Sequence, residues 1–543
     1  MKKYFNYLCI AVLAAALTSC SSFEKMKNID GITVQCNPEV LSEVGGKVPA
    51  TVTVTYPENY FNPKAILVVT PVLVYEGGQK SAASFTYQGS KVKDNNKVIS
   101  KDGGKATEKI TFDFVEGMEK SVFELHSVAY YKDKRIEIPA IKVADGVNVT
   151  CQLAKTDGIF GFKADEYEDV IKMTTEGQIL YDVNSANVKS KELKSKSIKD
   201  LQAALDEMKT NDRVTIKGTQ IVAYASPEGG EKYNSKLSDK RAGSAEQAWE
   251  KIAKGMDITE TEIMSIGQDW EGFREAVAAS NIEDKDLILR VLSMYSDPAV
   301  RESEIRNMSQ IFTELKAKVF PELRRARFIT TGEYQNYSDE ELYKLAEEQL
   351  NSLDEVSILH VAAITEDAGR KDVLYRYVAD RFNSQDALYD LAVLALESGK
   401  NDAAKSYLNR VNADDPDAVN LKGVLALRAG KVDEALGLFE KSGTEDAKAN
   451  ISAINILNGN YADAVNGAKG INAAVANLLA GDLNAASAAV AGCDCAKGDY
   501  IRAIIAARKG DSNGVKSNLD AAFKKDPSLK ARADKDIEFA DFR

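Results

Sequence analysis

Apolar and polar positions alternate along the early part of the chain, from about residue 30 to residue 155. The stretch at residues 50–56 reads ATVTVTY, and turns rich in glycine or asparagine separate it from five or six stretches of similar character. A period of two places one side of each strand in a core and the other side in water. Six or seven such strands predict an all-β sandwich.

From residue 172 to 335, strand-like stretches alternate with stretches whose apolar residues recur at helical spacing. The expected strands cover residues 178–186, 213–225, 261–267 and 323–332, and the expected helices cover residues 197–209 and 232–254. This alternation predicts a small α/β domain. A longer helical stretch at residues 269–319 interrupts the domain and is interpreted as a helical insertion.

A different repeat fills residues 340–543, where a glycine follows a run of small and apolar residues and a polar turn leads into a second run. The turn glycines are Gly369, Gly399, Gly430, Gly459, Gly481 and Gly510, at intervals of 30, 31, 29, 22 and 29 residues. This is the period of helical hairpins, in which glycine supplies the left-handed helix end. The region resembles degenerate tetratricopeptide repeats. The resemblance implies a solenoid that binds envelope proteins on a concave face, and the alternative is a solenoid that packs only on neighbouring domains.

Composition narrows the possible functions. A chain of 543 residues is too long for one core, and its net charge of -12 disfavours nucleic acid as the main partner. The two histidines, His126 and His360, stand far apart in sequence, and no nucleophile elbow, zinc-protease motif, P-loop or dinucleotide-binding fingerprint is present. We therefore expect no catalytic residues, no metal site and no cofactor, and interpret the protein as non-enzymatic.

The first residues have the order of an export signal. Two lysines follow the initial methionine, and the apolar segment at residues 7–17 is shorter than the roughly 20 residues that span a bilayer. Residues 17–20, LTSC, then resemble a bacterial lipobox. The resemblance implies a signal peptide over residues 1–19, acyl chains such as palmitate on Cys20, and a lipidated linker over residues 20–29. The alternative is an ordinary secretory signal with an incidental cysteine.

No aspartate follows Cys20, where two serines stand instead. By the same resemblance we expect anchoring in the outer membrane, facing the periplasm. Export also permits disulfides. Cys36 and Cys151 bracket the β-rich segment and form a possible disulfide, with two buried free thiols as the alternative. Cys493 and Cys495 lack the spacing of redox or zinc sites, so packing explains them better.

The stretch at residues 224–245, YASPEGGEKYNSKLSDKRAGSA, carries the strongest pattern of chemistry. Asn234, Leu237, Ser238 and Arg241 are spaced by three, one and three residues, which places them mostly along one helical stripe. A glycine turn precedes this helix, and a helix N-terminus favours an anion. Because Arg can bind a carboxylate through two parallel hydrogen bonds, the pattern predicts a site for a small carboxylate ligand.

Residues 233–242, YNSKLSDKRA, resemble the OmpA C-terminal-like family, which has the run N-x-x-L-S-x-x-R-A. The resemblance implies a periplasmic module that binds the peptidoglycan stem peptide through its diaminopimelate. This chain has Ser226 where the family carries an Asp, and Glu228 or Asp269 are candidate substitutes. The candidate peptidoglycan-binding residues are Ser226, Glu228, Asn234, Leu237, Ser238 and Arg241.

Two functions follow from these patterns. In the first, an outer-membrane lipoprotein contacts peptidoglycan through the OmpA-like domain and binds partner proteins through the repeats. In the alternative, the chain is a scaffold or accessory subunit of an outer-membrane secretion, uptake or fimbrial assembly, and its OmpA-like domain no longer binds peptidoglycan.

Overall fold

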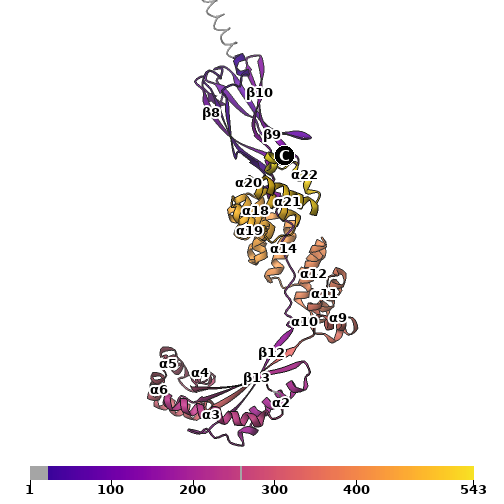
Figure 1. The fold of residues 1–543 in the computed structure, drawn as a ribbon. Coiled ribbons are helices and arrows are strands. Elements are labelled where there is room, and N and C mark those ends of the chain that lie inside the picture. The colour runs from indigo at the N-terminus through magenta and orange to yellow at the C-terminus, as the bar shows by residue number, and fades with distance from the viewer. Residues whose placement is uncertain (1–22, 257, 259) are drawn as a thin grey trace, which may run out of the picture. The chain divides into compact units, whose positions relative to one another are not determined.

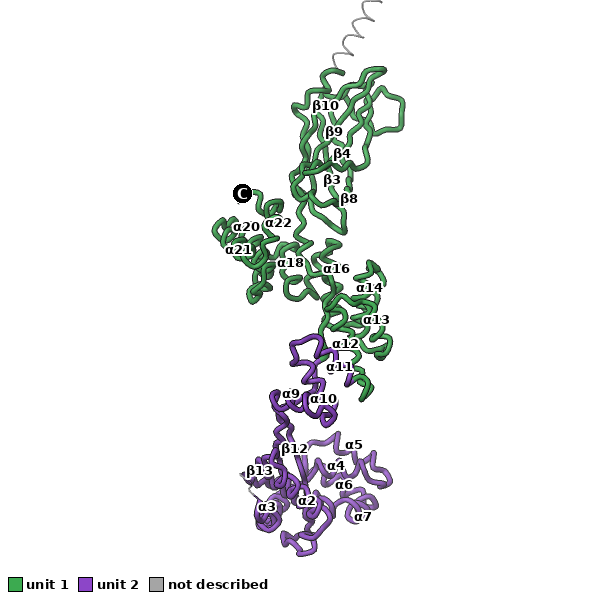
Figure 2. The backbone as a smooth tube through the Cα atoms, turned by 90° about the vertical axis from the view of Figure 1, so that its right-hand side faces the viewer, with its two compact units in different colours: residues 1–163, 379–543 green, residues 164–378 purple. Residues whose placement is uncertain are grey.

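The computed structural model describes residues 23–543 except residues 257 and 259. The expected signal peptide and the lipidation site Cys20 lie outside the described residues. The chain folds as two compact units: Met1–Lys163 with Ala379–Arg543 forms unit 1, and Ala164–Val378 forms unit 2 (Figure 2). In the described part, no helix combines the length and the apolar character needed to cross a bilayer.

The N-terminal part of unit 1 consists of two larger sheets around one core and a small third sheet. The strands are β1 (Thr33–Asn37), β2 (Leu41–Ser42), β3 (Lys47–Tyr56), β4 (Ile66–Tyr75), β5 (Gly78–Ser81), β6 (Phe85–Gly89), β7 (Lys97–Ile99), β8 (Gly104–Asp113), β9 (Ser121–Tyr131), β10 (Lys134–Asp145) and β11 (Val147–Asn148) (Figure 1). One larger sheet has the order β1-β3-β8, the other has the order β10-β9-β4-β6-β7 with β5 paired to β4, and in the third sheet β11 pairs with β2. Phe112 and Phe123 meet edge to face between the two larger sheets, with ring centroids 5.4 Å apart. The expected sheet-rich N-terminal region is confirmed.

The C-terminal part of unit 1 consists of helical hairpins. The helices are α12 (Gln385–Glu397), α13 (Asn401–Leu408), α14 (Pro416–Arg428), α15 (Val432–Ser442), α16 (Glu445–Leu457), α17 (Tyr461–Ala464), α18 (Gly470–Ala480), α19 (Leu483–Val490), α20 (Ala496–Arg508), α21 (Ser512–Lys525) and α22 (Leu529–Ala533). They pair in chain order from α12 with α13 to α20 with α21. The turn glycines from Gly399 to Gly510 have φ between 69° and 90°, the left-handed region that glycine adopts without strain. The expected tetratricopeptide-like hairpins are confirmed, with one correction: Gly369 lies inside helix α11 and not in a turn.

The two parts of unit 1 are joined by contacts between residues far apart in sequence. Arg532 donates a hydrogen bond to the Val149 carbonyl at 2.9 Å, and Asn148 donates one to the Glu538 carboxylate at 2.7 Å. The Gly45 amide donates to the Leu457 carbonyl at 2.7 Å. These contacts join residues that are hundreds of positions apart. The sequence pattern therefore indicates two separate regions, although they form one compact unit in the structure.

Unit 2 is built on a four-stranded sheet with the order β12-β15-β13-β14. Its elements are β12 (Val170–Leu180), β13 (Val214–Ala225), β14 (Glu260–Gln268), β15 (Arg325–Gln335), α2 (Lys196–Thr210) and α3 (Glu231–Ile252). Strand β13 is parallel to β14 and antiparallel to β15. Helices α2 and α3 share a core with the sheet, in which Trp249 stacks on Phe328 at 5.4 Å between ring centroids.

Further helices extend unit 2. A group between β14 and β15 has a core of its own around Phe273 and Phe320, and comprises α4 (Trp270–Ala279), α5 (Lys285–Met294), α6 (Pro298–Asn307), α7 (Ser309–Lys318) and α8 (Phe320–Leu323). Three helices follow the sheet: α9 (Asp339–Glu348), α10 (Glu355–Ile364) and α11 (Ala368–Phe382). The inserted helices thus form a small body of their own beside the sheet.

His360 on α10 holds two carboxylates together within unit 2. Its Nδ1 lies 3.1 Å from Asp165 and its Nε2 lies 3.0 Å from Asp339. Its ring stacks on Tyr167 with 4.4 Å between centroids. Partial burial opposes protonation, but the hydrogen bonds to Asp339 and Asp165 outweigh it and raise the pKa of His360.

His360→Asn should therefore lower the melting temperature at about pH 5.5 more than at about pH 8.5. The folded-state pKa lies above the ordinary value of 6.5, so the stabilisation is fully present below pH 6.5 and is lost as the pH rises through the folded-state value. Calorimetry at the two pH values measures the difference. Asp339→Asn removes one acceptor and should show part of the same pH dependence. An equal loss at both pH values would contradict the prediction.

Candidate functional site

The predicted stripe begins with Asn234 in the first turns of α3. The residue before this helix, Gly230, provides no side chain to cap it. The Asn234 side-chain amide donates to the Ser226 carbonyl at 2.9 Å and to the Gly229 carbonyl at 2.7 Å. Asn234 is buried, so its amide fastens the preceding loop onto the helix. Its partners are main-chain atoms of this chain.

Ser238, one turn further along, joins α3 to β14. Its hydroxyl accepts from the Gly267 amide at 3.0 Å, lies 2.7 Å from the Ser265 hydroxyl and donates to the Ser235 carbonyl at 2.8 Å. Leu237 is buried beside it. These two stripe residues therefore hold the helix against the sheet.

Arg241 is only 1% exposed and binds main-chain carbonyls. Its Nε donates to Ser185 at 3.0 Å, its Nη1 to Tyr224 at 2.8 Å and its Nη2 to Asp182 at 3.2 Å. Its guanidinium lies 5.0 Å from the centroid of the Tyr181 ring. Burial lowers the pKa of Arg241 to about 10, and Tyr181 opposes this shift. The guanidinium thus ties the segment after β12 to the end of β13.

Glu228 lies in the loop before α3 and has a cation of its own. Its carboxylate forms an ion pair with Arg324 at 2.9 Å and accepts a hydrogen bond from the Ser226 hydroxyl at 2.9 Å. Arg306 of the inserted helix α6 donates to the Glu228 carbonyl at 2.7 Å. The structure therefore brings Ser226, Glu228 and Asn234 together around one loop, and an inserted helix reaches that loop.

Asp269, the other candidate acid, is buried at the start of α4. It accepts from the Gly272 amide at 2.9 Å and pairs with Arg325 at 2.9 Å. Burial raises the pKa of Asp269, and the neighbouring Arg325 opposes this shift. Both acids that were candidates to replace the family Asp are thus paired with arginines of the same domain.

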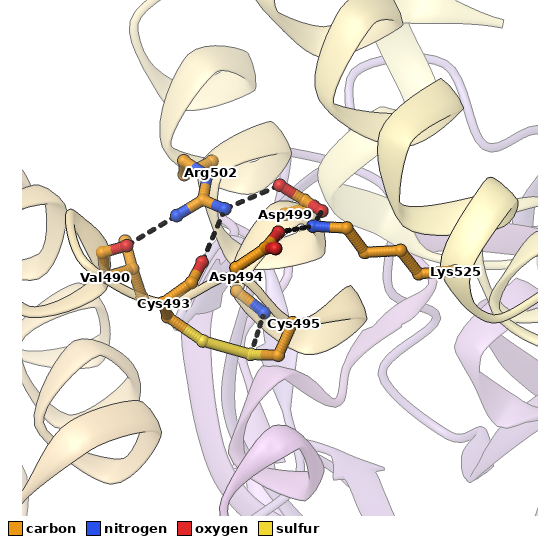
Figure 3. Close-up of a disulfide and its surroundings, with 8 residues drawn as sticks. Val490, Cys493, Asp494, Cys495, Asp499, Arg502 and Lys525 are labelled. Carbon is orange, nitrogen blue, oxygen red and sulfur yellow. Dashed lines mark hydrogen bonds and ion pairs between the residues drawn. A yellow bond between two sulfur atoms is a disulfide. The ribbon is translucent and has the colours of Figure 1, made fainter.

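The cysteines follow the expectation in part, because Cys36 and Cys151 match the free-thiol alternative while Cys493 and Cys495 do not match the expected packing role. Cys36 and Cys151 are free thiols, so the possible disulfide between them is not formed. Cys151 lies instead beside Glu43, and burial, with Glu43 adding to it, raises the pKa of the Cys151 thiol to about 12. The disulfide in the structure joins Cys493 and Cys495, where packing was expected (Figure 3).

A second candidate site, which the sequence analysis missed, lies in the helical repeats. Four buried polar side chains on successive first helices of the hairpins line a groove, and we call them the ladder: Asp390, Asn420, Asn450 and Asn472. They bind residues 155–163 of the same chain, which we call the strap. The strap follows the β strands in sequence and has no regular secondary structure.

We call each ladder residue a rung. Two rungs bind the strap main chain through both the oxygen and the nitrogen of a side-chain amide. Asn472 accepts from the Lys155 amide at 2.6 Å and donates to the Lys155 carbonyl at 2.9 Å. Asn450 makes the same pair of bonds with Ile159, at 2.6 Å and 2.8 Å. Asn420 donates to the Ile159 carbonyl at 3.1 Å and accepts from Asn450 at 2.9 Å. The amides thus take the place of a neighbouring β-strand.

The last rung binds a lysine at the end of the strap. Asp390 accepts from the Lys163 amide at 2.8 Å, and the Lys163 ammonium pairs with Asp417 at 2.5 Å and Asp415 at 3.2 Å. The ammonium also lies 5.0 Å from the centroid of the Tyr389 ring. Burial opposes the charge, but the two aspartates outweigh it and raise the pKa of Lys163.

The middle of the strap fits the groove by shape. Gly158 has a φ of +106°, and a Cβ there would lie 2.4 Å from the Val424 side chain. Phe160 packs against the hydrophobic cluster that contains Val424, and Arg428 lies 5.5 Å from the centroid of its ring. Arg428 also donates to the Asp157 carbonyl at 2.8 Å. A glycine and an aromatic residue two positions later are therefore what this part of the groove accommodates.

A sequence signal for the ladder exists. Its members are spaced by 30, 30 and 22 residues, close to the intervals of the turn glycines. Asn and Asp inside apolar helical runs at the repeat period indicate buried polar side chains with a shared partner. The identity of that partner carries no local signal, because the side chains bind main-chain atoms.

No protein-family model and no curated protein matches the sequence. Among solved structures, the chain is similar to a tetratricopeptide repeat protein from Parabacteroides merdae ATCC 43184, with 14% identity and a TM-score of 0.28 over 37% of this chain and 90% of that chain. It is also similar to the APC/C hetero-tetramer Cut9-Hcn1, with 11% identity and a TM-score of 0.32 over 48% of this chain and 57% of that chain. The paired helices from α12 to α21 themselves show the repeat fold.

Arg241→Met should lower the free energy of unfolding of unit 2 by about 3 kcal/mol or more, because it removes three hydrogen bonds from a charged donor, each worth roughly 1.5–3 kcal/mol. Both tryptophans, Trp249 and Trp270, belong to unit 2, so urea unfolding followed by tryptophan fluorescence reports this unit. Lys240→Met on the exposed side of α3 is the matched control. Equal, small effects of the two substitutions would contradict the structural role of Arg241.

Asn450→Ala should speed amide hydrogen exchange in the strap about tenfold or more, because it removes two hydrogen bonds to Ile159, each worth roughly 0.5–1.5 kcal/mol of local stability. Mass spectrometry of a peptide that covers residues 155–163 measures this rate. Asn484→Ala, at an exposed position of α19, provides the comparison. Unchanged exchange in Asn450→Ala would mean that other contacts hold the strap.

Proposed function

We propose that the protein is a non-enzymatic scaffold of a bacterial cell envelope, whose helical repeats hold partner proteins. In this proposal the lipid on Cys20 anchors the chain in the outer membrane, facing the periplasm. The lipobox-like residues 17–20 support this anchor, and they lie outside the described residues. The α/β domain of unit 2 no longer binds the peptidoglycan stem peptide.

The hydrogen bonds of Arg241 are the main reason why we propose that this domain does not bind peptidoglycan. A residue that clamps a ligand carboxylate presents parallel N–H groups to it. Arg241 is buried and donates to three main-chain carbonyls of its own domain. Ser226 supplies no charge for a ligand ammonium, and Glu228 already has Arg324. The OmpA-like stripe then serves as the internal fastening of α3.

The repeats support the binding of proteins. Each hairpin adds a pair of helices to an array, and such arrays offer extended surfaces for partners. The ladder shows that the groove of this array binds main chain in an extended conformation, with Asn472 and Asn450 each forming two hydrogen bonds to one residue. The repeats therefore already bind one extended segment, which belongs to the same chain.

We propose no catalysis, because both histidines are engaged by neighbouring carboxylates. His126 lies 2.8 Å from Glu124, and His360 binds Asp165 and Asp339. In the described part of the chain, no group of three or more His, Cys, Asp or Glu side chains is placed to hold a metal ion.

Sedimentation of the full chain with purified peptidoglycan sacculi tests the choice between the two functions. We expect the wild-type chain to stay in the supernatant, because Arg241 is committed to main-chain carbonyls. Fractionation of gently solubilised membranes should show the chain in an assembly larger than itself. Sedimentation of the wild-type chain that Glu228→Gln reduces would overturn the proposal and establish that the loop before α3 binds peptidoglycan.

A further inference from the structure

The groove along the ladder is built to receive a main chain. Asn450 is 0% exposed, and its side-chain oxygen and nitrogen both have partners in the strap or the ladder. Buried amide groups without partners are costly, so the groove needs an extended segment in place. The rungs bind N–H and C=O groups, which every extended segment other than one with proline at a rung can supply.

The strap meets the rungs at a regular interval and in a fixed direction. The residues bound are Lys155, Ile159 and Lys163, four positions apart, which an extended chain spans in about 13 Å. Lys155 lies at α18 and Lys163 at α12, so the strap runs opposite to the order of the repeats. The direction and the interval define how any segment must lie in the groove.

Side-chain selection comes from three positions of the strap. Gly158 lies against Val424, Phe160 packs into the cluster around Val424, and Lys163 is held by Asp415 and Asp417. A segment that fits therefore carries glycine, then an aromatic residue two positions later, then a cation three positions after that.

The strap is held along one side and leaves space beside it. Within residues 155–163, only Gly158 is buried. A cavity of about 670 Å³ lies along the first half of the strap, between Thr156 and Ile159 on one side and Ile471 at the start of α18 on the other. An entering segment can contact this space before the strap leaves, which makes replacement of one segment by another sterically accessible.

We propose that the groove is a binding site for an extended segment of a partner protein with the pattern glycine, any residue, aromatic, two residues, lysine or arginine, and that the strap is its resident ligand, which the partner segment replaces. This inference rests on the proposed function and specifies the surface and the chemistry through which the repeats hold a partner.

The test uses the full chain and a fluorescein-labelled peptide with the sequence of residues 154–164. Phe160→Ala weakens the resident strap and leaves the groove intact. Because an attached segment competes at an effective concentration in the mM range, we expect the Phe160→Ala chain to bind the peptide about tenfold or more tightly than the wild-type chain. Fluorescence anisotropy measures both affinities. Lys163→Ala, at a half-exposed strap position, weakens the strap by a second route and should give the same direction of change.

A matched pair of changes identifies the groove as the place of binding. A peptide with alanine in place of its lysine should bind the Phe160→Ala chain more weakly than the original peptide. Adding Asp417→Asn to that chain should weaken the original peptide and change the alanine peptide little, since the same ion pair is removed in both cases.

Three results would overturn the inference. The first is absence of peptide binding by both strap variants while their circular dichroism matches the wild type. The second is binding that ignores the lysine and Asp417. The third is that the Phe160→Ala chain forms a dimer that the free peptide dissociates. This result would mean that a second copy of the chain occupies the groove. If the strap variants do not bind the peptide but the membrane assembly is still observed, the partner binds another face of the repeats. Loss of the assembly itself would contradict the proposed function.

Discussion

The pairing of buried side-chain amides with an extended main chain is the interaction on which unit 1 depends. Residues 155–163 lie in neither a helix nor a sheet, so their N–H and C=O groups need partners from elsewhere. The ladder supplies these partners from four successive hairpins. Because the ladder side chains are buried and their partners lie in the strap, neither the strap nor the groove is complete without the other. A sheet-rich region and a distant helical array therefore form one compact body.

Unit 2 uses the same principle with a charged side chain. Arg241 binds carbonyls of Asp182, Ser185 and Tyr224, which lie just after β12 and at the end of β13, two strands that β15 separates in the sheet. A buried guanidinium with several donors suits this task as well as it suits a ligand carboxylate. The stripe on α3 that looks like a binding site in the sequence is thus also what fixes α3 and its loop. The same hydrogen-bonding side chains can thus bind a ligand in one protein and stabilise the fold in another.

Local sequence patterns predicted the helices and strands. They did not predict the main-chain contacts between residues far apart in sequence. The alternation at residues 50–56 lies within β3, and the glycines from Gly399 to Gly510 stand in turns, because both signals depend on neighbours along the chain. Gly369 has the right spacing but lies inside α11, since spacing alone does not report φ. The disulfide of Cys493 and the strap contacts of Asn450 depend on geometry that the sequence does not encode locally. The fold was therefore more predictable than the partners of its polar residues.

The strap also constrains the order in which the protein can fold. Its contacts join residues separated by 227 to 317 positions, and unit 2 lies between them in the chain. Synthesis delivers the strap long before the hairpins that bind it. Contacts of such long sequence separation form slowly and leave surfaces exposed in the meantime. The β-rich region therefore keeps its docking surface exposed until the last third of the chain is made, and a holding chaperone would find its substrate in that interval.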